Sequence, residues 1–190
     1  MRKKVMKKKT SLLALLMQVK DKRNASGKRH QLVHLLLIII MGTMSGYEGF
    51  RGLEAFVIRY KDDLIGLLQI SRKETPSMAT LRRVMISIDF NQLSFAMYKW
   101  TRGRIKIRNK EWIASDGKGI KGTVKDYNSK YQNFVSLVSL YCGRAGVVLC
   151  SAAFSNKQES EIVVLRQLLQ SLDIQGAVLT ADAMHCQKKR

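Results

Sequence analysis

The sequence predicts an α+β or α/β protein in which an all-helical N-terminal module precedes a region with the order β-β-β-α-β. Apolar residues recur at helical spacing up to about residue 100, and short apolar runs of strand length follow. Two of these runs end in an aspartate, Asp116 and Asp182. An acid at the end of a buried strand would place its carboxylate at the rim of the sheet, where a pair could bind Mg²⁺. Two ordinary turn acids at strand ends are the open alternative.

The charge of the chain is strongly basic. Its 190 residues include 34 Lys or Arg and 14 Asp or Glu, which gives a formal net charge of +20. Such an excess predicts a polyanionic partner, either nucleic acid or an anionic membrane surface. The 46% of hydrophobic residues is typical of a folded protein rather than a disordered one. Three cysteines without a C-x-x-C spacing fit a reducing compartment.

The N-terminus begins with a basic leader over residues 1–10. The apolar run at residues 12–17 has the composition of a signal-peptide core, but no small-residue cleavage site follows it. A second apolar run, Leu35–Met41, is far shorter than the roughly 20 residues that span a bilayer. We therefore expect no membrane span and a cytoplasmic, nucleoid-associated location.

Helical periodicity predicts one domain over residues 11–100. Thr75-Pro76-Ser77 is a helix start signal, with Ser77 as the N-cap. Glycines between residues 42 and 52 separate two of the helices. The expected helices cover residues 11–19, 31–41, 47–60, 61–68, 78–88 and 89–100.

Between the helical half and the strand half of the chain, a Lys or Arg occurs at every second position from residue 102 to residue 110. An extended segment would place all of them on one face, where they could contact DNA, whereas a solvated basic linker is the equally open alternative. Trp100 and Trp112 bracket the segment. Stacking on unpaired bases is conceivable for them, but we expect them to pack in the core at the domain junction. The alternating cations are Arg102, Arg104, Lys106, Arg108 and Lys110.

The second half contains four apolar runs and one amphipathic segment. The helix between the third and fourth strands allows a right-handed crossover, which returns the fourth strand parallel to the sheet. Beside the first strand, it would bring Asp182 next to Asp116. This is the arrangement of the ribonuclease H-like fold. The expected strands cover residues 111–118, 134–141, 146–153 and 176–180, with the helix at 159–172.

Several motifs resemble the DDE transposases of the H-repeat-associated group, and the resemblance covers nearly the whole chain after the basic leader. In the second half they are Asp116-Gly-Lys118, the stretch Lys157–Ile162 and the stretch Thr180–Lys188. In the first half, Asp21–Arg23, Gly27–His30 and Met44–Phe50 resemble the helical transposase-associated domain that precedes the catalytic core.

The resemblance implies DNA strand cleavage and transfer at insertion-sequence ends, with Mg²⁺ as cofactor and Mn²⁺ as its substitute. Asp116 and Asp182 would be the first two metal-binding acids, and residues 101–190 the N-terminal part of a ribonuclease H-like catalytic domain. Lys118 and Lys121 would contact DNA phosphates, with solvated loop lysines as the open alternative. The other predicted DNA-binding residues are Arg102, Arg104, Lys106 and Arg108.

The chain departs from the family pattern at three places. Asp21-Lys-Arg23 stands where Asp-Pro-Arg is common, and Lys121-Gly122 where Arg-Gly is common. The third catalytic acid of the family lies far downstream, whereas this chain stops at Arg190. Glu159 and Glu161 could substitute for it, although first-turn acids stabilised by the helix dipole are the favoured interpretation.

These departures leave two functional hypotheses. The first is an insertion-sequence transposase fragment, truncated before the third acid and inactive alone. The alternative is a non-catalytic basic DNA-binding protein derived from such a transposase. Both predict double-stranded DNA at insertion-sequence ends as the partner, a homodimer as the candidate assembly, and no membrane.

Overall fold

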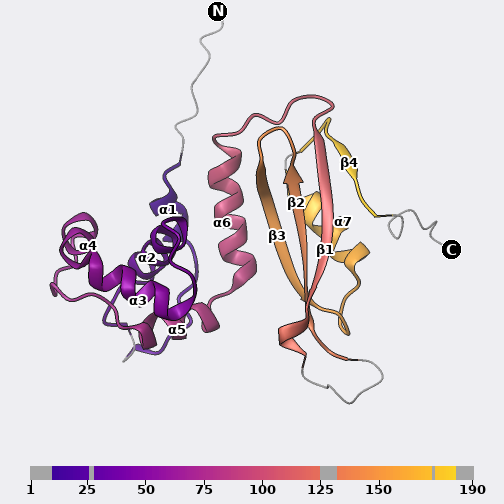
Figure 1. The fold of residues 1–190 in the computed structure, drawn as a ribbon. Coiled ribbons are helices and arrows are strands. Elements are labelled where there is room, and N and C mark those ends of the chain that lie inside the picture. The colour runs from indigo at the N-terminus through magenta and orange to yellow at the C-terminus, as the bar shows by residue number, and fades with distance from the viewer. Residues whose placement is uncertain (1–9, 26–27, 125–131, 173, 183–190) are drawn as a thin grey trace, which may run out of the picture. The chain divides into compact units, whose positions relative to one another are not determined.

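The computed structural model describes residues 10–25, 28–124, 132–172 and 174–182. The chain divides into two compact units (Figure 1). One is helical and covers Leu12–Asp89, and the other contains the sheet and begins at Phe90. The basic leader, except for residue 10, lies outside the described residues, as do residues 183–188 of the motif around Asp182.

Five helices form the helical unit. The central helix, α2, is apolar almost all round, and its Leu35 and Ile38 are fully buried. A side chain on Gly42 of α2 would approach Leu53 Cδ2 of α3 to 2.7 Å, so glycine allows the two helices to lie close together. The predicted cap of α5 is confirmed, because Ser77 Oγ accepts a hydrogen bond from the Thr80 backbone N–H at 3.4 Å. The helices are α1 (Leu12–Leu16), α2 (Leu32–Met44), α3 (Gly49–Arg59), α4 (Lys61–Leu68) and α5 (Met78–Ser87).

No single helix among the described residues is both long and apolar enough to cross a membrane. The pair α2 and α3 meets the length and composition of a span only when the two are taken together, and a bend of 101° separates them.

The described part of the second unit is a mixed sheet with two α-helices and one short 3₁₀ helix (Figure 1). Its strand order is β3-β2-β1-β4, in which β2 is antiparallel to both β1 and β3, and β4 is parallel to β1. This confirms the predicted β-β-β-α-β order and the position of the fourth strand beside the first. The elements are α6 (Phe90–Arg102), β1 (Trp112–Ile120), the 3₁₀ helix η2 (Lys121–Thr123), β2 (Val135–Cys142), β3 (Val147–Ser155), α7 (Glu161–Ser171) and β4 (Val178–Thr180).

One face of the sheet is covered by α7, which lies behind the sheet in Figure 1. Ile113 of β1 and Leu140 of β2 are fully buried in one cluster with Leu165 of α7. Side chains alternate between the two faces of a strand, so Trp112 points to the opposite face, which we call the open face. Trp112 is 63% exposed there, and the expectation that it packs in a core is therefore wrong.

The outer edge of β3 is covered by α6 through polar side chains. Ser94 Oγ accepts a hydrogen bond from the Ser151 backbone N–H at 2.9 Å. Asn91 Oδ1 accepts one from the Ala153 N–H at 3.0 Å, and Asn91 Nδ2 donates to the Ala153 carbonyl at 3.4 Å. These bonds satisfy backbone groups that an uncovered edge strand would leave open to pairing with another chain.

The start of β1 is fixed by a charged pair. Arg144, in the turn between β2 and β3, donates from Nε to Glu111 Oε2 at 2.6 Å and from Nη2 to the Lys106 carbonyl at 2.8 Å. The Glu111 carbonyl accepts from the Val178 N–H of β4 at 2.8 Å. Glu111 therefore links the β2–β3 turn, β1 and β4 at one end of the sheet.

Replacing Arg144 by methionine should destabilise the sheet unit in a pH-dependent way. The hydrogen bond from Arg144 holds the pKa of the Glu111 carboxyl below its ordinary value of 4.5. A depressed pKa contributes stability that is present above pH 4.5 and is lost as the pH falls through the lowered value. The difference in unfolding free energy between wild type and Arg144→Met should thus be larger at neutral pH than at about pH 3, where most carboxyls are protonated.

Urea unfolding followed by tryptophan fluorescence measures this difference, because both tryptophans, Trp100 and Trp112, belong to the sheet unit. The control is Arg166→Met, at an exposed arginine of α7. An equal loss of stability at both pH values in Arg144→Met would contradict the assignment.

Two Val→Ala substitutions on neighbouring strands test which face of the sheet holds the core. Val138 is fully buried under α7, whereas Val148 is 52% exposed on the open face. Val138→Ala should lower the unfolding free energy by about 1.5–3 kcal/mol, and Val148→Ala by less than about 0.5 kcal/mol. Similar values from urea unfolding would mean that the open face is also covered.

Candidate active site

Asp116 lies on β1, and Asp182 follows β4, the parallel neighbour of β1. Trp112 pairs with Val178, and Ala114 with Thr180. The ladder ends there, and the same register carried on by two residues would match Asp116 with Asp182, because residues in register on parallel neighbours lie on the same face. Both side chains are exposed.

Asp116 does not lie at the end of its strand, contrary to the prediction. It is opposite Ser139 of β2, and β1 continues to Ile120 because residues 117–120 remain paired with β2. Its carboxylate therefore leaves the sheet from the open face and not from the rim. Asp182 lies two residues beyond the last residue of β4.

Glu161, one of the two acids considered as a substitute for the third, lies against the other face. Its carboxylate occupies the space in which a side chain on Gly117 would stand. Because neighbouring residues of a strand face opposite ways, Asp116 points away from this carboxylate. Ser115, on the same face as Gly117, has a buried Oγ without a hydrogen-bond partner among the residues that the structure describes. Glu159, the other acid considered, precedes α7 and is exposed.

The donor chemistry of the pair fits a hard divalent cation. Aspartates offer oxygen ligands only, which Mg²⁺ prefers and Mn²⁺ also accepts. Within the described ranges, no group of three or more His, Cys, Asp or Glu side chains is arranged to hold a metal ion. The donor type of Asp116 and Asp182 thus suits Mg²⁺, while the described residues contain no assembled set of metal ligands.

The two predicted phosphate-contacting lysines follow Asp116 along the chain. Lys118 lies two residues further on β1, on the same face, and is exposed. Lys121 begins η2 and is also exposed. The Thr123 hydroxyl donates to the Ile120 carbonyl at 2.6 Å and accepts from the Val135 N–H at 2.8 Å, which ties η2 to the start of β2.

The alternating cations do not form one extended strand. Arg102 is the last residue of α6. Arg104 folds back on the helix, with its guanidinium 4.3 Å from the centroid of the Trp100 ring and Nη1 donating to the Trp100 carbonyl at 2.9 Å. A common face for all five cations is therefore absent from this described segment.

In residues 105–108, exposed and half-buried side chains alternate although the backbone forms no helix or strand. Lys106 and Arg108 are exposed, and between them Ile107 is half-buried against the core of the sheet unit. Lys110 adopts a positive φ of 60° and donates its N–H to the Gly176 carbonyl at 2.6 Å. The exposed cations are thus held close to the sheet by the isoleucine.

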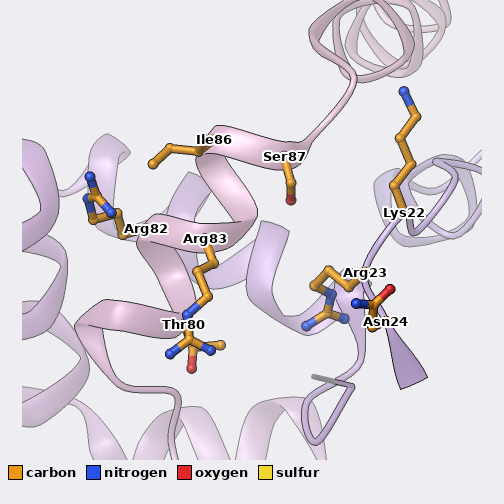
Figure 2. A pocket seen from close by; sticks show the side chains of 8 residues that line it. All are labelled: Lys22, Arg23, Asn24, Thr80, Arg82, Arg83, Ile86 and Ser87. Carbon is orange, nitrogen blue, oxygen red and sulfur yellow. The ribbon is translucent and has the colours of Figure 1, made fainter. Parts of the chain in front are cut away.

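Sequence reasoning missed a basic pocket in the helical unit (Figure 2). It has a volume of about 530 Å³ and lies between α5 and the segment that follows α1. The adjacent Arg82-Arg83 pair, on a helix that is otherwise short of charge, is the sequence signal that could have indicated it. The lining residues are Lys22, Arg23, Asn24, Thr80, Arg82, Arg83, Ile86 and Ser87.

A comparison with protein-family models identifies the class of the helical region. Residues 13–101 match the model of the DDE_Tnp_1-associated family. This range contains α1 to α6, apart from the first residue of α1 and the last residue of α6. The chain therefore carries a DDE_Tnp_1-associated domain. No solved structure shows significant similarity to it.

Several relatives are Escherichia coli proteins named as putative transposases. The "H repeat-associated putative transposase YhhI" of Escherichia coli K12 is 28% identical over 90% of this chain and 44% of its own length. The "Putative transposase YncI" of Escherichia coli O157:H7 is 28% identical over 94% of this chain and 45% of its own length. The chain is thus a distant homologue of proteins named H repeat-associated putative transposases, as its motifs predicted, and it spans less than half the length of these two relatives.

Proposed function

We propose that the chain is part of an insertion-sequence transposase that cleaves and transfers DNA strands, with Asp116 and Asp182 as metal-binding acids. The observation that supports the proposal is the β1–β4 register, which would match the two aspartates on one face of the sheet when it is continued two residues beyond its last pair. The transposase names of the relatives support it, and so does the DDE_Tnp_1-associated domain.

Each group would have a defined task. When bound, divalent ions would activate the attacking water or hydroxyl and stabilise the leaving oxygen of the phosphodiester. The carboxylates of Asp116 and Asp182 would hold the ion on the open face, where DNA has access to both side chains. Mn²⁺ would substitute for Mg²⁺, because it accepts the same oxygen ligands.

The charge of the chain supports DNA as the partner. A net charge of +20 attracts a polyanion, and Lys118 and Lys121 would contact phosphates as point charges near the metal. The exposed Lys106 and Arg108 would add backbone contacts, together with Arg102 and Arg104 at the end of α6. The substrate would be the double-stranded ends of an insertion sequence, in the cytoplasm at the nucleoid, with a homodimer as the candidate assembly.

Replacing either aspartate should weaken metal binding without unfolding the chain. Asp116→Asn and Asp182→Asn remove a negative charge but little volume, so each should lower the Mn²⁺ affinity by about tenfold or more, equivalent to about 1.4 kcal/mol. Titration calorimetry measures the affinity. The control is Asp62→Asn, at an exposed aspartate in the first turn of α4. Equal Mn²⁺ affinity in all four proteins would remove the metal assignment.

A nicking assay then separates catalysis from binding. The substrate is a supercoiled plasmid that carries the gene with its native flanking DNA, in the presence of Mg²⁺ or Mn²⁺. Metal-dependent nicking that is lost in both aspartate variants would support the transposase proposal. DNA binding without nicking by the parent chain would favour the alternative of a non-catalytic DNA-binding protein.

A further inference from the structure

We infer that the helical unit binds the phosphodiester backbone of duplex DNA in a basic groove beside α5. The inference deepens the proposed function, on which it rests, by assigning DNA contacts to a unit that contains neither aspartate. The α5 groove consists of the pocket in Figure 2 and an adjoining pocket of about 450 Å³, which share Thr80 and Arg83. The second pocket adds Arg29, His30, Glu74, Thr75 and Ser77.

Arg83 occupies the centre of the groove. It is exposed on α5, lines both pockets, and faces Arg23 and Asn24 across the first pocket in Figure 2. Arg29 lines the second pocket and is also exposed. Neither Arg83 nor Arg29 forms an ion pair within the part of the chain that the structure describes. Both guanidinium groups are therefore available to a phosphate.

Arg23 has a different task, because its charge is already used. Its Nε and Nη2 donate to the two carboxylate oxygens of Asp21 at 2.9 and 2.8 Å, and Nη2 also donates to the His30 carbonyl at 2.9 Å. Its side chain is only 10% exposed. Arg23 thus holds Asp21 and the His30 carbonyl close together, and Lys22 and Arg29 are the chain neighbours of these contacts.

The charge of the groove is positive after its acids are counted. Its five cations are opposed by Asp21, by Asp89, which pairs with Lys22 at 3.2 Å, and by Glu74. The other four acids of the helical unit belong to α3, α4 or the residue before α3. The cations of the groove are Lys22, Arg23, Arg29, Arg82 and Arg83.

The pKa of His30 depends on the charges in the groove and can report whether an anion is bound there. The pKa of its imidazole lies below the ordinary value, and burial is the largest cause. The charge of Glu74 raises this pKa, whereas the nearby charges of Arg23, Arg72 and Arg29 lower it. A phosphate in the groove would oppose those cations, so the pKa of His30 should rise when the groove is occupied. A ligand bound elsewhere on the chain would leave it unchanged.

A short fluorescently labelled DNA duplex tests the inference by anisotropy over a range of salt concentrations. Arg83→Gln and Arg29→Gln should each weaken binding about tenfold at physiological salt. Each should also reduce the slope of log K against log salt concentration by about 0.9 for the lost phosphate contact. The loss should be the same for duplexes of unrelated sequence, because backbone contacts carry no base information.

Arg51→Gln is the matched control, since Arg51 is an exposed arginine of α3 outside the groove and its loss removes the same charge. Equal effects of Arg51→Gln and Arg83→Gln on the slope would overturn the inference. An NMR titration of His30 in the presence and absence of the duplex is the second measurement. A pKa of His30 that rises supports the groove, and an unchanged one overturns it. Unaltered circular dichroism of the variants confirms that they fold.

The Mn²⁺ titration at Asp116 keeps this inference separable from the proposed function. If Arg83→Gln loses DNA affinity but metal binding does not depend on Asp116, DNA binding in the α5 groove is supported and the metal-dependent transposase function is contradicted. If metal binding depends on Asp116 but Arg83→Gln binds DNA like Arg51→Gln, the groove alone is removed.

Discussion

The hydrogen-bonded pairing of β1 with both of its neighbours is the constraint on which the sheet unit depends. β1 is antiparallel to β2 along eight residue pairs and parallel to β4 along three. The first ladder decides which way each residue of β1 faces, and it places Ile113 in the core and Asp116 on the open face. The second ladder places Leu179 of β4 opposite Ile113 and Thr180 opposite Ala114. A slip of the first ladder by one residue would turn Asp116 to the face covered by α7.

Much of the fold was predictable from periodicity and turn signals. Ser77 predicted the start of α5, and the helix between the last two strands predicted the parallel return of β4. The extent of β1 was not predictable, because Gly117 and Gly119 are poor strand formers and the stretch resembles a loop. Pairing with β2 overrides this local preference, since eight backbone partners are in register. Asp116 is consequently a mid-strand residue.

The sequence was least informative about surfaces that combine distant segments. Arg23 and Arg83 are 60 residues apart in the sequence, and no periodicity links them. Only the fold of the helical unit brings both to one pocket. The basic repeat from Arg102 to Lys110 shows the converse, because its regular spacing allowed either a shared face or a solvated linker, and the end of α6 prevents the shared face. The spacing of charges within one segment was thus a poor guide to where basic surfaces form, because such surfaces depend on which segments the fold brings together.

The central claim is that β1 and β4 are parallel neighbours in a register that matches Asp116 with Asp182. Solution NMR tests it most directly, through nuclear Overhauser contacts between backbone protons of the two strands. The account predicts contacts that pair Ile113 with Leu179 and Ala114 with Thr180, together with a protected amide proton on Val178, whose N–H donates to the Glu111 carbonyl. Contacts displaced by one residue, or an antiparallel pattern, would contradict it, because the two carboxylates would then leave the sheet on different faces or at different ends.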